Sequence, residues 1–154
     1  MSLTAGVTRK SEGIDDVHWS IFGQVYTPKT ITEDCFSWHA LLPSETFVPP
    51  HIHPTQDEYI QVLSGALDLT IDGQQFHANE GDLVHLPRGI PHGIFNNTGH
   101  DVNCLFWVTP TGKLVDLFRK LHNMGRPDEV VALCPDYDVN FLPPVRAADV
   151  IDLQ

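Results

Sequence analysis

The feature that most constrains this chain is a set of three histidines and one glutamate among the glycines and prolines of residues 51–96. Residues two apart on a strand project from the same face, so His51 and His53 can meet one ion without a bend in the chain. Neutral imidazole together with carboxylate suits divalent iron, manganese, nickel, cobalt, copper or zinc. We predict one such ion inside a small β-barrel, held by His51, His53, Glu58 and His92.

Other polar residues near this cluster leave alternatives open. Asp57 would be a ligand if the preceding turn were one residue shorter, and Gln56 could contact the ion or one of its ligands. Both are more simply interpreted as solvated turn residues. His39 and His85 lie on expected strands and could reach the barrel interior. Three or four protein ligands leave one or two coordination positions open, which favours chemistry over a purely structural role.

Short segments of alternating polarity surround the cluster. Residues 35–42 place Phe36, Trp38, Ala40 and Leu42 on one face, and residues 58–64 alternate in the same way. Asp72-Gly73 predicts a two-residue hairpin turn. In all, the chain contains about nine or ten such segments with turns every eight to twelve residues, a pattern typical of a β-sandwich or barrel.

The apolar period changes after Pro110. Leu114, Leu117, Phe118 and Leu121 form one stripe of a helix. Thr111 is a candidate cap at its start, and Pro127 can open a second short helix. We expect both helices to cover one end or face of the barrel.

Composition and charge limit the class of protein further. A chain of 154 residues is long enough for one domain with a sizeable core. The formal charge of −11 argues against nucleic acid and anionic membranes as partners. No apolar run is long enough to span a membrane or resembles a secretory signal. Three scattered cysteines, Cys35, Cys104 and Cys134, indicate reduced thiols in a cytoplasmic protein.

These patterns predict one domain over residues 1–154 with four parts. The parts are an N-terminal arm (1–15), a β-barrel (16–109), a helical segment (110–134) and an extended or irregular C-terminal tail (135–154).

The spacing of the cluster also carries a family resemblance. Residues from His51 to Gly65 match His-x-His-x4-Glu-x6-Gly, and residues from Gly81 to Asn96 match Gly-x5-Pro-x-Gly-x2-His-x3-Asn. Together they resemble the two signature motifs of the cupin family. The resemblance implies an all-β fold, the cupin double-stranded β-helix or jelly-roll barrel, here with a short C-terminal helical segment, and it implies the same four metal ligands. One position departs from the motif: the residue six before His51, usually glycine, is Glu45.

The inward faces of the expected strands predict a substrate pocket. It is largely apolar and aromatic, and therefore suits a planar phenolic or enolic small molecule. The same side chains could instead fill the barrel core. The predicted lining residues are Phe36, Trp38, Phe47, Ile60, Val62, Ile94, Cys104 and Phe106.

A small chain with one set of these motifs, followed by Thr-Pro-Thr-Gly and a helix, resembles the quercetinase-like dioxygenases. The resemblance implies that Glu58 is ligand and general base at once, accepting the proton of the substrate hydroxyl. Two alternatives remain: a metal-dependent isomerase, epimerase or lyase that uses the ion as a Lewis acid, and a non-catalytic module that binds small molecules. Edge strands of an open jelly roll invite pairing, so we expect a homodimer, with Val17–Tyr26 as a candidate interface.

Overall fold

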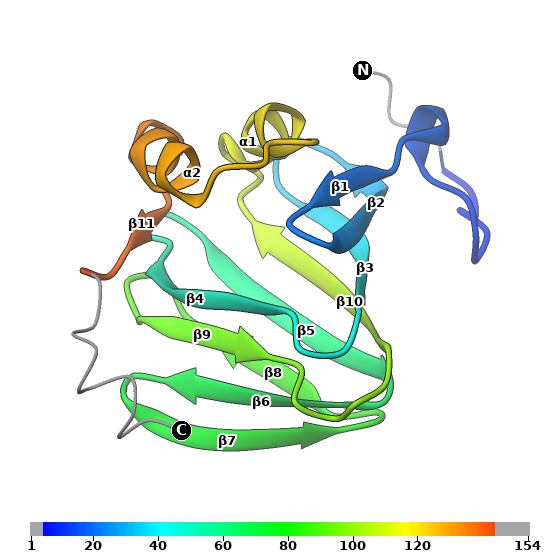
Figure 1. Ribbon diagram of the computed structural model, residues 1–154. Coiled ribbons are helices and arrows are strands. Elements are labelled where there is room, and N and C mark those ends of the chain that lie inside the picture. Colours follow the sequence, from blue (N-terminus) through cyan, green and yellow to red (C-terminus); the bar gives the residue numbers. More distant parts are fainter. Residues whose placement is uncertain (1–4, 144–154) are drawn as a thin grey trace.

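Two antiparallel sheets form the barrel in the computed structural model, which describes residues 5–143 (Figure 1). Consecutive strands repeatedly change sheets, as in the jelly roll implied by the sequence, and that prediction is confirmed. The six-stranded sheet contains, in spatial order, β1 (Trp19–Ile21), β2 (Gln24–Ile31), β3 (Phe36–Leu42), β10 (Val102–Thr109), β5 (Asp57–Ser64) and β8 (Leu83–Leu86). The five-stranded sheet contains β11 (Asn140–Phe141), β4 (Phe47–Ile52), β9 (His92–Phe95), β6 (Ala66–Ile71) and β7 (Gln74–Asn79).

Strand alternation sets which side chains enter the space between the sheets. On β3, every second residue from Phe36 to Leu42 is buried and the residues between are half-buried. On β5, Glu58, Ile60 and Val62 are buried in the same way. The predicted faces of both strands are confirmed. Glu58 is therefore carried into the interior by the same alternation that buries its apolar neighbours.

Three turns explain particular sequence positions. Asp72 and Gly73 have φ values of 51° and 79° and join β6 to β7, which confirms the predicted hairpin. Gly65 ends the first motif at φ 86°, and a Cβ there would lie 2.9 Å from the side chain of Val102. Glu45, which replaces the usual glycine, has φ 67°. The turn before β4 thus keeps the left-handed backbone that glycine adopts most easily.

Helices α1 (Leu114–Leu121) and α2 (Pro127–Leu133) lie over one end of the barrel, near β1 and β11 (Figure 1). The predicted stripe of α1 is buried. The prediction that Thr111 caps α1 was wrong: Lys113 is the N-cap residue, and the Thr111 hydroxyl instead donates to the Thr32 carbonyl. Within residues 5–143, no helix is both long and apolar enough to cross a membrane.

Aromatic packing joins the helical segment to the barrel. The Phe118 ring of α1 lies 5.1 Å from both Tyr26 and Trp38, and 5.8 Å from Phe36. Aromatic rings at such separations add to the free energy gained by burial alone. The position of α1 is therefore set by the rings that the six-stranded sheet presents beneath it.

The two ends of the chain lie against the sheets in different ways. In the arm, the Lys29 ammonium group donates to the carbonyls of Arg9, Lys10 and Glu12, which holds this segment beside β2. A short 3-10 helix, η1 (Ile14–Asp16), precedes β1. In the tail, the 3-10 helix η2 (Cys134–Tyr137) leads into β11, which pairs with β4. The predicted tail beyond residue 143 and arm residues 1–4 lie outside the described residues.

The remaining expectations concern thiols and assembly. Cys35, Cys104 and Cys134 are unpaired in the structure. Burial raises the pKa of the Cys104 thiol to about 12 and that of Cys134 to about 11, so neither is a ready nucleophile. Strand β1 forms one edge of the six-stranded sheet. A homodimer formed through Val17–Tyr26 stays a prediction.

Candidate metal centre

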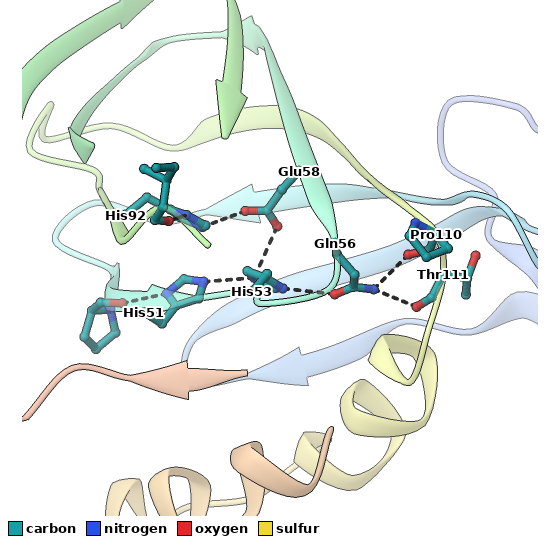
Figure 2. Close-up of polar contacts among 9 residues, drawn as sticks. His51, His53, Gln56, Glu58, His92, Pro110 and Thr111 are labelled. Atoms are coloured by element: carbon teal, nitrogen blue, oxygen red, sulfur yellow. Dashed lines mark hydrogen bonds and ion pairs between the residues drawn. The ribbon is translucent and has the colours of Figure 1, made fainter. Parts of the chain in front are cut away.

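The four predicted ligands come together from both sheets (Figure 2). His51 on β4 lies opposite His92 on β9, and His53 follows directly after β4. Glu58 reaches them from β5 in the other sheet. One ligand atom from each residue lies within 4.8 Å of all the others, and no residue of the set is more than 4% exposed.

Hydrogen bonds on the outer side of each ring fix its protonation and orientation. In each of the three histidines of the cluster, Nδ1 faces a carbonyl or amide oxygen, which can only accept a hydrogen bond. Nδ1 therefore carries the proton, and the lone pair of Nε2 faces the centre. In proteins this arrangement is typical of histidines that bind metal. The Nδ1 contacts are His51 to the Pro49 carbonyl (2.8 Å), His53 to Gln56 Oε1 (3.0 Å) and His92 to the Ile90 carbonyl (3.3 Å).

The atoms that face the centre, Nε2 of each histidine and the carboxylate oxygens of Glu58, lie close together without a proton between them. The Nε2 atoms of His51 and His53 are 3.1 Å apart, and Nε2 of His92 lies 2.9 Å from Oε2 of Glu58. Despite that short distance, neither atom of the second pair has a hydrogen-bond partner among the described residues, because each directs a lone pair at the other. Ligand atoms about 2.0–2.2 Å from one ion lie about 3–4 Å from each other. The separations, including 4.0 Å between His53 Nε2 and Glu58 Oε1, fit such an ion.

The charges of the cluster are those that metal binding requires. Burial first, and then the charges of His92 and His53, lower the pKa of His51 to about 3, so its imidazole is neutral. Burial would raise the pKa of Glu58, but the charges of His53, His92 and His51 together lower it. Glu58 is therefore an anion beside the neutral imidazole of His51. The donor set and its protonation fit one divalent transition metal ion.

Gln56 supports this cluster, although the sequence favoured a solvated turn residue at this position. Its side chain is only 2% exposed. Its amide nitrogen donates to the carbonyls of Pro110 and Thr111, at 3.0 and 2.7 Å, which leaves Oε1 facing His53 (Figure 2). The amide is thus oriented by three contacts, and it orients the ring of His53 in turn. The alternative that Gln56 contacts a ligand agrees with this geometry.

Three other candidates lie outside the centre. Asp57 points to the surface, where its carboxylate accepts hydrogen bonds from Arg88. The prediction that His39 and His85 could reach the interior was wrong. His39 alternates with buried residues of β3 and so lies on the outer face, and the exposed ring of His85 stacks on Tyr59 at 4.9 Å. Strand parity alone accounts for both positions.

An apolar cavity of about 360 Å³ adjoins His51, His53 and Glu58. Four of the predicted pocket residues line it: Trp38, Phe47, Ile94 and Phe106. Four others point inward but pack in the core, where each is at most 1% exposed: Phe36, Ile60, Val62 and Cys104. Phe47 is 55% exposed, which places it on the open side of the cavity. The volume lies within the range of small-molecule sites, about 300–1,000 Å³.

Several cavity residues were not predicted. Tyr26 and Gln24 enter from β2, and the helical segment supplies apolar side chains from α1 and α2. Phe141 of β11 lies against the cluster, with its ring 5.5 Å from that of His51. The apolar stripe of α1 predicted that its side chains are buried, but such a pattern does not show which buried side chains meet an open space. The lining residues from the helices are Leu114, Leu117, Phe118, Leu121, Pro127, Val130 and Val131.

Comparison with known proteins adds a family and a local relative. Residues 37–109 match the family model described as a cupin domain. Quercetin 2,3-dioxygenase of Bacillus subtilis is 43% identical to this chain over 44 residues, which make up 29% of this chain and 13% of that protein. The chain spans less than half the length of the curated relatives that it matches.

Solved structures share the fold. An RmlC-like cupin from Shewanella frigidimarina superposes with a TM-score of 0.65 at 13% identity, over 75% of this chain and 99% of that one. A cupin described as a sugar phosphate isomerase, from Silicibacter pomeroyi, superposes with a TM-score of 0.54 at 23% identity, over 60% of this chain and 62% of that one. At these identities the likeness shows the fold alone.

Proposed function

The chain belongs to the cupin superfamily, and from this premise we propose that it is a metal-dependent dioxygenase acting on a small enolic or phenolic, flavonol-like substrate. One observation carries the proposal: a buried carboxylate and three imidazoles face a common point that opens onto an aromatic cavity. The local similarity to a quercetin dioxygenase supports the substrate class.

His51, His53, His92 and Glu58 are the residues that would hold the ion, a single divalent transition metal. A bound ion would supply Lewis acidity, which favours ionisation of an enol or phenol hydroxyl. Glu58 is the group in reach that can accept the released proton, because its carboxyl is anionic and its Oε2 atom has no hydrogen-bond partner among the described residues. It would therefore act as ligand and general base.

The cavity walls favour a flat, uncharged molecule. Trp38 and Phe106 stack with ring centroids 5.2 Å apart, and Phe118 meets Trp38 edge-on. Such walls exclude water and bind aromatic rings through dispersion and burial. No lysine or arginine occurs among the described residues that line this cavity. A phosphate group placed away from the metal centre would lack a cation among these residues, which makes a phosphorylated sugar a poorer substrate for this site than an uncharged aromatic molecule.

The test combines metal analysis with assays of dioxygen uptake. The purified protein is loaded separately with iron, manganese, nickel, cobalt, copper and zinc, and its metal content is measured. It is then assayed with 3-hydroxyflavone in an oxygen electrode. We expect dioxygen consumption with at least one redox-active ion. In Glu58→Gln, at equal metal content, the rate should fall about 100-fold or more, because the general base is lost.

The same assay separates the alternative functions. Asp57→Asn is the matched control, since it changes the neighbouring carboxylate without touching the cluster. Conversion of substrate without dioxygen uptake, supported by zinc, would indicate an isomerase or lyase and refute the dioxygenase. Binding of substrate without turnover under any of these metals would indicate a non-catalytic binding protein.

A further inference from the structure

We propose that the N-terminal arm and the outer face of the six-stranded sheet form a second binding site, for a small oxyanion that carries a phosphate or a carboxylate group. A groove of about 270 Å³ lies there. Thr27 and His39 line it from the outer face of β2 and β3. The residue before each of them, Tyr26 or Trp38, lines the inner cavity instead. The sheet therefore separates the groove from the metal centre, and the site is independent of the proposed function. The lining residues of the groove are Lys10, Ser11, His18, Val25, Thr27, His39, Leu41 and Asn103.

Strand pairing brings the polar side chains of the groove floor together. Thr27 of β2 lies directly opposite His39 of β3, and side chains opposite each other on one face are about 5 Å apart. Nδ1 of His18 lies 2.7 Å from Oγ1 of Thr27, which adds a second imidazole. Asn103 of β10 reaches His39 from the other side through a hydrogen bond between their side chains. Imidazole, hydroxyl and amide groups thus form one continuous set, and each of them can donate a hydrogen bond.

The arm adds a cation to this floor. The Lys29 ammonium group donates to three carbonyls of the arm, including that of Lys10 at 3.1 Å. These bonds hold the arm beside β2, where Lys10 and Ser11 line the groove. Among the described residues, the ion pairs of lysine and arginine all involve arginines, so neither Lys10 nor Lys29 is paired with a carboxylate. The positive charge of Lys10 is therefore available to a ligand.

The groove is positive, although the chain as a whole is strongly negative. The formal charge is −11, yet no aspartate or glutamate occurs among the described residues that line the groove. Burial lowers the pKa of His39, against the hydrogen bond to Asn103, which raises it. The charges of Lys29 and Lys10 lower the same pKa, so both ammonium groups are near enough to act on this imidazole. An anion bound here would meet positive charge and several hydrogen-bond donors.

The size and chemistry of the groove select the kind of ligand. Its volume lies just below the range of about 300–1,000 Å³ for sites that hold drug-sized molecules, so it suits a small anion. Phosphate and carboxylate oxygens accept hydrogen bonds from ammonium, imidazole, hydroxyl and amide groups alike. A metal ion is the other ligand that two imidazoles could hold. The nearby charges of Lys10 and Lys29 disfavour a cation here, and the walls supply no carboxylate.

Titration of the zinc-loaded protein with sodium sulfate or sodium acetate, followed by two-dimensional NMR, tests the site. Sulfate represents tetrahedral dianions such as phosphate, and acetate represents carboxylates. Sodium chloride keeps the ionic strength constant, because charge interactions at the surface depend on salt. We expect the backbone amide signals of Ser11, Thr27 and His39 to shift saturably with at least one anion, with a Kd of about 1–5 mM. Tighter binding of sulfate would assign the site to phosphates, and tighter binding of acetate would assign it to carboxylates.

Two variants remove the proposed contacts one at a time. Lys10→Gln removes the cation of the arm, and His39→Thr removes an imidazole from the floor. Each should weaken anion binding about two- to fivefold, the range for an exposed charged contact. Lys120→Gln, on the exposed side of α1, makes the same change in net charge away from the groove and should bind like the wild type. Because Lys10 is exposed in the arm, Lys10→Gln decides the case if His39→Thr folds poorly.

Three results would overturn the site. The first is the absence of saturable shifts with either anion up to about 50 mM, ten times the weakest expected Kd. The second is a set of shifts centred on His51, His53 and His92, which would place the anion at the metal centre. The third is equal affinity in Lys10→Gln and the wild type. None of them bears on the proposed dioxygenase, whose assay uses a flavonol and dioxygen.

Discussion

The two ends of the cavity are held in different ways. At the metal-binding end, formed by His51, His53, Glu58 and His92, each imidazole is oriented by a hydrogen bond from its Nδ1 atom. The walls of the helix-covered end are apolar and held by packing, and they are formed by Leu114, Leu117, Phe118 and Leu121 of α1 together with Val130 of α2. Hydrogen bonds have fixed directions, whereas apolar contacts adapt to shape. The first end therefore determines the chemistry, and the second determines which molecules fit.

If the two ends of the cavity are held by separate interactions, a substitution at one end should leave the structure of the other largely unchanged. Loss of a ligand should greatly weaken metal binding without unfolding the barrel, and loss of an apolar wall should lower stability without changing the metal affinity. The variants below test this separation.

The largest effect is expected for His92→Ala. Removing one of four ligands leaves an incomplete set, so the affinity for zinc should fall by more than about a hundredfold, since even outer partners of ligands contribute about 10–100-fold. The measurement is competition with a chromogenic chelator, accompanied by circular dichroism. His85→Ala, an exposed histidine on β8, should bind zinc like the wild type. Tight, stoichiometric zinc in His92→Ala would contradict the assigned centre.

At the helix-covered end, Leu117→Ala should lower the free energy of unfolding by about 2–3 kcal/mol, the lower part of the range for buried leucines, because the site borders an existing cavity. Leu117 is 2% exposed. Zinc affinity should stay within about twofold of the wild type, and chemical denaturation of the zinc-loaded protein gives the stability. A loss of zinc affinity comparable to that of His92→Ala would show that the two ends are coupled.

Gln56→Leu tests the outer hydrogen bond of His53. The substitution keeps the side chain close to its original size but removes the acceptor at 3.0 Å, so zinc affinity should fall about 10- to 100-fold, or about 1.4–2.7 kcal/mol. The adjacent variant Asp57→Asn breaks a surface ion pair and should change zinc affinity little. Equal affinities in Gln56→Leu and the wild type would mean that His53 needs no such support.

The contrast between the two ends also marks what the sequence could and could not predict. The ligands were predicted because spacing on paired strands determines which side chains meet, as for His51 and His53. Gln56 was assigned to solvent because nothing in the local pattern shows that Pro110 and Thr111, distant in sequence, close over it. These partners come from tertiary structure.

The cavity was predicted only in part for a similar reason. Alternation identifies inward residues but does not separate those that fill the core, such as Phe36 and Ile60, from those that line a space, such as Trp38. That distinction depends on tertiary structure, because the positions of α1 and α2 relative to the sheets decide where an open space remains. Tyr26 lies on a strand that was predicted, yet its role as a wall depends on the same arrangement.

The smallest effect is expected for Glu45→Gly, in the turn before β4. Glu45 is exposed and has φ 67°, a backbone that costs a non-glycine residue about 1 kcal/mol or more. Glycine removes this strain but loses more entropy on folding. The net gain in stability should be about 0.5 kcal/mol, seen as a small rise in Tm, with zinc affinity unchanged. A lower Tm in Glu45→Gly would show that Glu45 makes a contact worth more than the strain.

Anomalous X-ray diffraction from crystals of the zinc-loaded protein, recorded on both sides of the zinc absorption edge, tests the central claim most directly. The account predicts one strong anomalous peak at about 2.0–2.2 Å from Nε2 of the three histidines and from a carboxylate oxygen of Glu58. Full zinc loading with the peak at another place, or with these four side chains turned away from it, would contradict the account.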